Sequence, residues 1–282
     1  MIPPIARRFV AGETPAEALE YVRTINEAGV GAMVNRLGSH TRERSKAEAT
    51  AAEYRSFVRD VDEANLTASV ALKPTQIGLE LGEEAFRELL SGIVSVAAER
   101  DVFVWVDMEE HATTDATLDA FEEVARAAGG GVGVCLQANL KRTPADLDRL
   151  ADVPGAVRLV KGTAYDPPPR VAHTDGERID RVYRSLLRDA FERFDGTVAV
   201  ASHDPEMIDH AISLHERYGT DFEIQMLMGV RPEAQIRRAR EYDVSQYVPY
   251  GPRWKRWALN RARNGVRFAA KDALDGAVGI HG

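Results

Sequence analysis

Ala156-Val157-Arg158-Leu159-Val160-Lys161-Gly162 is the stretch around which the rest of the chain can be arranged. Its aliphatic side chains predict a short buried strand over residues 156–160. An arginine stands in the middle of this strand, and a lysine and a glycine follow it directly. Each buried cation costs several kcal/mol of desolvation unless an anionic group meets it. Arg158 therefore indicates either a structural ion pair with a neighbouring acid or a bound anionic ligand.

Apolar runs of the same kind recur along the chain and alternate with long amphipathic stretches. The runs predict strands over residues 30–34, 68–72, 102–106, 132–136, 156–160, 197–201, 222–226 and 246–250. The amphipathic stretches predict helices over residues 15–28, 44–64, 82–100, 115–128, 175–194, 205–218, 232–242 and 253–268, with a short helix from Thr143. Eight strand–helix units in 282 residues match a (βα)8 barrel of the TIM type, for which about 250 residues is typical.

No shift of composition marks a boundary between domains. We therefore expect one α/β barrel domain over residues 1–282, in which residues 1–28 form an N-terminal segment and a helix before the first strand. A doubly wound open sheet is the second choice, but no G-x-G-x-x-G turn follows any of the predicted strands.

The composition argues against several classes of protein. The net charge of −8 disfavours a general nucleic-acid binder and attachment to anionic lipid by charge alone. The single cysteine, Cys135, excludes an intrachain disulfide and a cysteine-based zinc site. No signal-peptide pattern opens the sequence, and no apolar run approaches the ~20 residues of a transmembrane helix. We therefore expect a cytoplasmic protein without a transmembrane segment.

Polar side chains follow nearly every predicted strand. They are Lys73, Asp107, Gln137, Arg158 with Lys161, His203, Gln225 and Tyr247. In a parallel barrel these strand ends meet on one face, where ligands bind. We expect no metal there, because no histidine motif or further acid accompanies Asp107 and Glu109. The cations and amides instead suit a phosphate, a carboxylate or the electron-rich edge of a flavin.

Blocks of sequence at these strand ends resemble the proline dehydrogenase family. The blocks are Ser69-Val70-Ala71-Leu72-Lys73-Pro74-Thr75-Gln76-Ile77-Gly78-Leu79, Val106-Asp107-Met108-Glu109, Leu136-Gln137, Val157-Arg158-Leu159-Val160-Lys161-Gly162, Ala201-Ser202-His203, Phe222-Glu223-Ile224-Gln225-Met226-Leu227-Met228-Gly229-Val230 and Tyr247-Val248-Pro249-Tyr250-Gly251. Residues 8–14 also resemble the N-terminal segment of the short, single-function bacterial members. Each block is weak alone, but their order and spacing match the family over nearly the whole chain.

The resemblance implies a distorted (βα)8 barrel that binds FAD, with the final helix over the barrel mouth. The family oxidises L-proline to Δ1-pyrroline-5-carboxylate by hydride transfer to the flavin, and the electrons pass to a quinone or a similar acceptor. The resemblance further implies a protein that can lie against the membrane while it reduces quinone. A pyrroline-carboxylate dehydrogenase is the partner enzyme that it implies.

The resemblance also implies roles for the strand-end residues. The catalytic group is expected to be Arg158, Lys73 and Asp107, with Arg158 against the flavin nitrogen that receives the hydride. Lys73 and Asp107 are expected to pair at the substrate floor, where Lys73 binds the proline carboxylate and Tyr247 packs on the substrate ring. The cofactor contacts are expected from Asp107, Gln137, Arg158, Lys161, Gly162, His203 and Gln225.

The last predicted helix departs from the family pattern. The family has Y-x-x-R-R-L-x-E, whose two arginines bind the substrate carboxylate, whereas residues 257–264 here are W-A-L-N-R-A-R-N. Arg261 matches one arginine, Asn260 replaces the other, and Asn264 replaces the glutamate. We expect Asn260 and Arg261 to contact the substrate. An asparagine gives a weaker contact to a carboxylate than a guanidinium, which can form two charge-assisted hydrogen bonds.

Three functions are therefore open at the level of sequence. The first is a flavoenzyme that oxidises proline or a close cyclic imino acid. The second is a non-catalytic relative that keeps the flavin, or only the barrel. The third is a flavin-free lyase that uses Lys161 or Lys73 as a Schiff-base amine.

Overall fold

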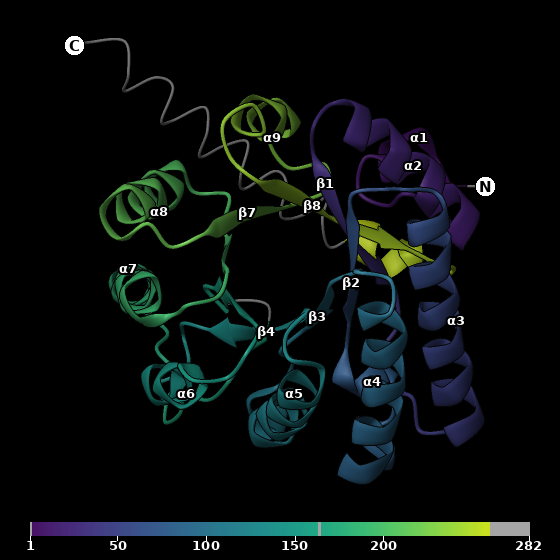
Figure 1. Cartoon of the computed structure of the whole chain (residues 1–282), viewed down its shortest axis with the longest axis horizontal. Helices are drawn as coiled ribbons and strands as arrows, with labels where there is room; N and C mark the ends of the chain where they lie inside the picture. Colours follow the sequence, from purple (N-terminus) through teal and green to yellow (C-terminus); the bar gives the residue numbers. More distant parts are fainter. Residues whose placement is uncertain (1, 163–164, 260–282) are drawn as a thin grey trace.

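The computed structural model describes residues 2–162 and 165–259. Its eight parallel strands pair in sequence order and close into a barrel, which confirms the predicted fold (Figure 1). The strands are β1 (Gly31–Arg36), β2 (Ala68–Leu72), β3 (Val104–Val106), β4 (Val132–Gln137), β5 (Ala156–Val160), β6 (Val198–Ala201), β7 (Phe222–Leu227) and β8 (Val244–Tyr250). The second choice, an open sheet, is excluded because β1 pairs with both β2 and β8.

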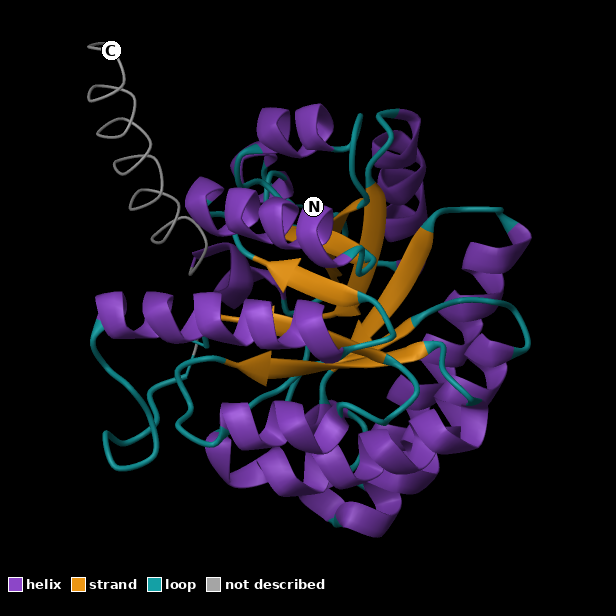
Figure 2. Ribbon diagram, turned by 60° about the vertical axis from the view of Figure 1, so that its left-hand side comes forward, coloured by secondary structure: helices purple, strands orange, loops and turns teal. Residues whose placement is uncertain are grey.

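Helices form an outer ring around the barrel (Figures 1 and 2). They are α3 (Arg44–Glu63), α4 (Glu83–Ala98), α5 (Thr114–Ala128), α6 (Thr143–Leu150), α7 (Gly176–Arg193), α8 (Pro205–Tyr218) and α9 (Pro232–Arg238). Most ends lie within two residues of the prediction. The exception is α9, which ends at Arg238 rather than at residue 242. Short 3-10 turns at Pro74–Gln76, Leu79–Leu81 and His111–Thr113 were not predicted.

The strands are buried on both faces, as expected for a parallel barrel surrounded by helices. One face of each strand packs on the helices, and the other contributes to an interior cluster. That cluster contains Met33, Ala71, Trp105, Ala156, Ala199 and Tyr247. Gly133 on β4 makes room for the largest of these side chains, because a Cβ atom there would lie 2.4 Å from the Trp105 ring. The interior is therefore a packed core with an indole near its centre.

The helix that covers β1 and β8 comes from the amino-terminal end of the chain. After a short helix α1 (Pro4–Arg7), α2 (Pro15–Glu27) begins with a capping box between Thr14 and Glu17 and packs against both strands. The Tyr21 hydroxyl donates a hydrogen bond of 2.6 Å to Gln246 on β8. Residues 254–259 are also helical, but α2 rather than this segment covers β1 and β8 on the barrel wall.

The outer helices are amphipathic rather than apolar all round. Within residues 2–162 and 165–259, no helix combines the length and apolar character needed to cross a membrane.

Candidate active site

Charged and polar groups meet inside the barrel near the carboxyl ends of β1, β3, β4, β5 and β8. The strand register places Cys135 beside Arg158 and Met33 beside Tyr247. Asp107 follows β3 directly, and its backbone N–H donates to the Leu72 carbonyl at 2.9 Å. Residues that are far apart in sequence are thus held within one interior space.

Arg158 is the buried cation of this space, with 3% of its surface exposed. One terminal nitrogen pairs with the Asp107 carboxylate, and the other lies 2.8 Å from the Met33 sulfur. The guanidinium carbon also lies 5.2 Å from the centre of the Trp105 ring, within cation–π range. Burial, the largest single influence, would lower the pKa of Arg158, but the Asp107 carboxylate together with Cys135 and Tyr247 raises it above its usual value. The structural ion pair predicted for Arg158 is therefore present.

Tyr247 completes the cluster. Its hydroxyl donates to the second carboxylate oxygen of Asp107 at 3.0 Å. Burial, followed by the negative charge of Asp107, raises the pKa of Tyr247 well above its usual value. The phenol therefore stays protonated, and Asp107 is held from two sides by Arg158 and Tyr247.

Lys161, three residues after Arg158, lies at the rim rather than in the interior. Its ammonium nitrogen is 2.5 Å from an oxygen of Asp180 on α7 and 3.2 Å from an oxygen of Asp204. Asp204 also caps the amino end of α8. The Lys161 side chain is 27% exposed, compared with 4% for that of Arg158. The two cations therefore occupy different environments.

Gln137 fixes the loop that follows β3. Its side-chain nitrogen donates to the backbone carbonyls of Met108 and Glu109, at 3.3 and 3.0 Å. The Glu109 carboxylate in turn accepts the backbone N–H of Thr75 at 2.9 Å. These bonds connect the ends of β2, β3 and β4, so Gln137 has a clear part in shaping the site.

Several buried acceptors near the strand ends have no partner among the described residues. They are the side-chain oxygens of Asn35, Asn139 and Gln225. Gly162 approaches Asn139 so closely that a Cβ atom would lie 2.0 Å from its side-chain oxygen. Unsatisfied buried acceptors are costly and rare in proteins. Their presence here, with Gly162 in close contact with Asn139, suits a ligand that brings N–H or O–H donors.

Comparison with known proteins identifies the family. The family model for proline dehydrogenase matches residues 18–256. Proline dehydrogenase 1 of Bacillus subtilis (strain 168) is 34% identical over 261 residues, which cover 91% of this chain and 85% of that protein. The chain belongs to the proline dehydrogenase family. Proline dehydrogenase of Deinococcus radiodurans is 32% identical over 274 residues, or 94% of this chain and 88% of that protein.

A solved structure supports the fold independently. The crystal structure of proline utilization A from Bdellovibrio bacteriovorus, inactivated by N-propargylglycine, matches with a TM-score of 0.81 at 21% identity. The match covers 89% of this chain but only 31% of that protein. This chain therefore shares its fold with about a third of that longer protein.

The expected pairing of Lys73 with Asp107 is wrong. Asp107 pairs with Arg158 instead, and in residues 2–162 and 165–259 no ion pair joins Lys73 to any acid. Lys73 is half-buried at the end of β2, where the following backbone is drawn into the turn Pro74–Gln76. A buried arginine needs a counter-charge more than a partly exposed lysine does, which explains which cation holds Asp107.

The remaining predicted residues fall into three groups. Gly162 contacts Asn139, and Gln225 donates to Glu223 at 2.8 Å, so both belong to the wall of the proline dehydrogenase barrel. His203 lies at the end of β6, and its backbone carbonyl accepts a bond of 2.8 Å from Arg231. Asn260 and Arg261 lie outside the described residues, as does Asn264.

Several residues of the site were not predicted from the sequence. Met33 and Trp105 contact Arg158 directly, and Glu223 places an acid inside the barrel. Trp257, which follows β8, stacks on Tyr247 with ring centres 6.1 Å apart. The alternation of side chains along each strand could have indicated Trp105 and Glu223, since they lie two positions before the predicted site residues Asp107 and Gln225. No predicted site residue on β1 gave such a signal for Met33.

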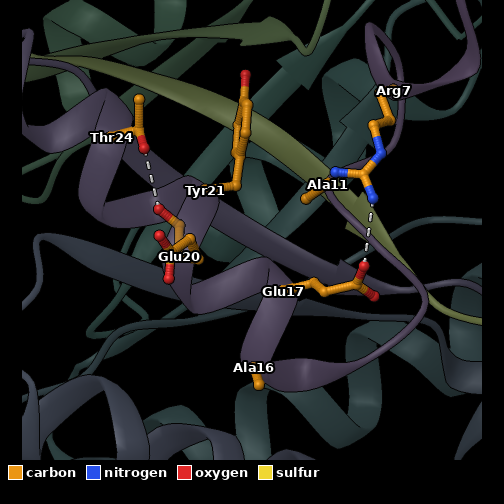
Figure 3. Close-up of a pocket in the computed structure, with 7 residues that line it drawn as sticks. All are labelled: Arg7, Ala11, Ala16, Glu17, Glu20, Tyr21 and Thr24. Atoms are coloured by element: carbon orange, nitrogen blue, oxygen red, sulfur yellow. Dashed lines mark hydrogen bonds and ion pairs between the residues drawn. The ribbon is translucent and has the colours of Figure 1, made fainter. Parts of the chain in front are cut away.

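A surface pocket of about 490 Å3 lies elsewhere, along α2 (Figure 3). It is lined by Arg7, Ala11, Ala16, Glu17, Glu20, Tyr21 and Thr24. Two of its charged groups are already paired, since Arg7 lies 3.6 Å from Glu17. The pocket is on the outer helix rather than at the strand ends, so it is separate from the Arg158 cluster.

Proposed function

We propose that this chain is an FAD-dependent proline dehydrogenase. It would oxidise L-proline to Δ1-pyrroline-5-carboxylate and pass the electrons to a quinone-type acceptor. The observation that carries this proposal is the buried cluster of Arg158, Asp107 and Tyr247 inside the barrel of a chain that belongs to this family. A pyrroline-carboxylate dehydrogenase would consume the product. Because quinones reside in lipid, the reaction would take place at a membrane surface.

The described residues fit FAD as the cofactor. A flavin nucleotide brings N–H and O–H donors for the buried oxygens of Asn35, Asn139 and Gln225. Its phosphates would suit the Lys161 ammonium at the rim. Gly162 would allow close approach of the backbone, since its φ of +83° and its contact with Asn139 leave no room for a side chain.

The cluster supplies fixed charge and fixed donors to the reaction. A bound FAD would supply the acceptor for the hydride that leaves the ring carbon next to nitrogen on the side away from the carboxylate. Arg158 places a permanent positive charge in a water-poor space, where it stabilises negative charge that develops during reduction. Asp107 holds both Arg158 and the protonated Tyr247 in place before the substrate arrives. The side chains therefore need little reorganisation during turnover.

The contacts of Lys161 argue against the lyase alternative. Its nitrogen is ion-paired with both Asp180 and Asp204. A Schiff-base lysine has to present an unprotonated amine to a carbonyl carbon.

The proposal is tested by turnover of the FAD-loaded chain with L-proline and a soluble quinone analogue. The expected product is lighter than proline by two hydrogens and appears in step with quinone reduction. The same chain without proline is the control for background quinone reduction. If the FAD-loaded chain reduces no quinone with proline but oxidises other cyclic imino acids, the proposed substrate is wrong and the proposed class of reaction stands.

A further inference from the structure

The amino-terminal segment crosses the carboxyl end of β8, and we call its residues 9–13 the strap. The Ala11 N–H donates to the Pro249 carbonyl at 2.9 Å, and the Gly251 N–H donates to the Gly12 carbonyl at 2.9 Å. The strap thus makes backbone bonds on both sides of Tyr250, at the point where β8 ends. Its position relative to β8 is fixed by main-chain bonds rather than by exposed side chains.

The strap also holds the helical residues that follow β8. The indole N–H of Trp257 donates to the Phe9 carbonyl at 3.0 Å. The indole N–H of Trp254 donates to the Glu13 carboxylate at 3.1 Å. Two hydrogen bonds from one turn of helix therefore end on the two ends of the strap.

Gly229, just after β7, allows the strap to pack closely against the barrel. A Cβ atom at Gly229 would lie 2.2 Å from the Arg8 carbonyl oxygen and 2.8 Å from the Phe9 ring. On the other side of the strap, Val10 is fully buried in a small apolar cluster with Leu37 and Ala258. The strap is therefore enclosed by three separate parts of the chain.

Trp257 connects the strap to the active site. Its ring packs on the small cluster around Val10 and also on the interior cluster of the barrel. It stacks on Tyr247 with ring centres 6.1 Å apart and planes inclined by 24°, within the range of favourable aromatic pairs. Tyr247 in turn donates to Asp107. An unbroken series of contacts runs from the Phe9 carbonyl to the Arg158–Asp107 pair.

We propose that the strap positions Trp257 against Tyr247 and thereby sets how tightly the active site binds the substrate. Trp257 is a positioning residue in this account, because it acts through the ring of Tyr247. The inference rests on the proposed function, since it concerns the affinity of the same site for proline. Holding the phenol at its hydroxyl through Asp107 and at its ring through Trp257 leaves it little freedom, which lowers the entropy lost when a substrate binds.

Two matched pairs of variants test this proposal. Gly229→Ala pushes on the strap without touching Trp257, and Gly219→Ala is its control. Both glycines have nearly the same left-handed φ, +78° and +75°, but a Cβ at Gly219 meets nothing within 4 Å. Trp257→Phe removes the indole bond to Phe9 while keeping an aromatic ring. Trp254→Phe removes the other indole bond to the strap and is its control.

The KM for proline, kcat, flavin content and melting temperature are measured for all four variants. We expect Gly229→Ala and Trp257→Phe to raise the KM about threefold to tenfold, with kcat changed less than about twofold, from the size of aromatic-pair and positioning effects. Gly219→Ala and Trp254→Phe should keep the KM within about twofold, even where the melting temperature falls equally. A merely structural strap would lower the melting temperatures and leave every KM alike.

Either of two results overturns the proposal. One is a KM for Trp257→Phe equal to that of the wild type. The other is an equal rise in KM within each pair, which would make the effect one of general loosening. Turnover of the wild type with proline is measured first, so failure of the proposed function is seen separately from failure of the strap.

Discussion

Arg158 lies on β5 and Lys161 follows directly after that strand, yet the two cations have opposite surroundings. Arg158 is buried and meets one carboxylate, Asp107, together with the Met33 sulfur and the Trp105 ring. Lys161 is partly exposed at the rim and meets two carboxylates, Asp180 and Asp204. The inner cation is enclosed by groups from inside the barrel. The outer one is held by groups on surrounding helices.

The difference indicates a division of work between the two cations. Loss of one partner of a buried ion pair strongly destabilises the folded protein. An exposed ion pair contributes little to stability and can rearrange. We therefore propose that Arg158 acts in the chemical step and that Lys161 retains the cofactor. The two roles are separate if variants at the inner and outer positions have different effects, and they are not if the effects are the same.

Loss of the inner cation should have the largest effect. Arg158→Met keeps an unbranched side chain but removes the charge that we propose stabilises the reduced flavin. We expect flavin reduction by proline to slow by about 100-fold, the scale seen when one preorganised donor is removed. Rapid mixing of the FAD-loaded variant with proline measures the rate. A rate within about threefold of the wild type would remove Arg158 from the chemical step.

Neutralising the inner acid should strongly lower stability. Asp107→Asn leaves the buried Arg158 without its counter-charge, and we expect the free energy of unfolding to fall by about 3 kcal/mol. Asp180→Asn, at the rim, is the matched control and should lower it by less than about 1 kcal/mol. Denaturant unfolding of both variants measures the difference. Equal losses would mean that burial does not separate the two pairs.

Loss of the outer cation should weaken cofactor binding more than it slows the chemistry. Lys161→Met removes the charge that we propose contacts the cofactor, and we expect the Kd for FAD to rise about tenfold. The rate of flavin reduction at saturating FAD should fall by no more than about threefold. Titration of the apoprotein with FAD, followed by rapid mixing with proline, separates these quantities. A slow reduction with unchanged FAD affinity would reverse the assignment.

The smallest effect is expected at Glu223, which is an interior acid without a cation in ion-pair range among the described residues. Burial raises its pKa above the usual 4.5. The folded chain therefore binds this proton more tightly than the unfolded chain, so its contribution to stability is lost as the pH rises through the raised pKa. Glu223→Gln should raise the melting temperature by about 2 °C at pH 7 and leave it unchanged at pH 4. An equal shift at both pH values would contradict this cause.

The barrel itself could be predicted from the sequence because each strand carries its own local signal. The bounds of β2 and β5 were predicted correctly, since each apolar run stops at a polar residue. The helix over residues 232–242 was predicted too long for a related reason. Tyr242 continues the apolar pattern, but it packs on Phe222 from a turn beyond the end of α9, with ring centres 5.7 Å apart. Periodicity indicates burial and does not by itself specify helix.

The composition of the site could be predicted better than its pairings. Arg158, Asp107 and Tyr247 were placed at strand ends, and the structure brings them together. The partner of Asp107 was misassigned, because the pairing with Lys73 was taken from the family resemblance, whereas Arg158 reaches Asp107 from 51 positions away in sequence. The stack of Trp257 on Tyr247 depends on the strap and on α2, and no local pattern encodes such long-range packing.

The visible spectrum of the FAD-loaded chain, before and after anaerobic addition of L-proline, tests whether proline reduces the flavin in a step that depends on Arg158. Our account predicts a flavin absorption band that bleaches with proline in the wild type and bleaches far more slowly in Arg158→Met. A flavin band that proline leaves unchanged in the wild type, or a chain that takes up no FAD, would contradict it.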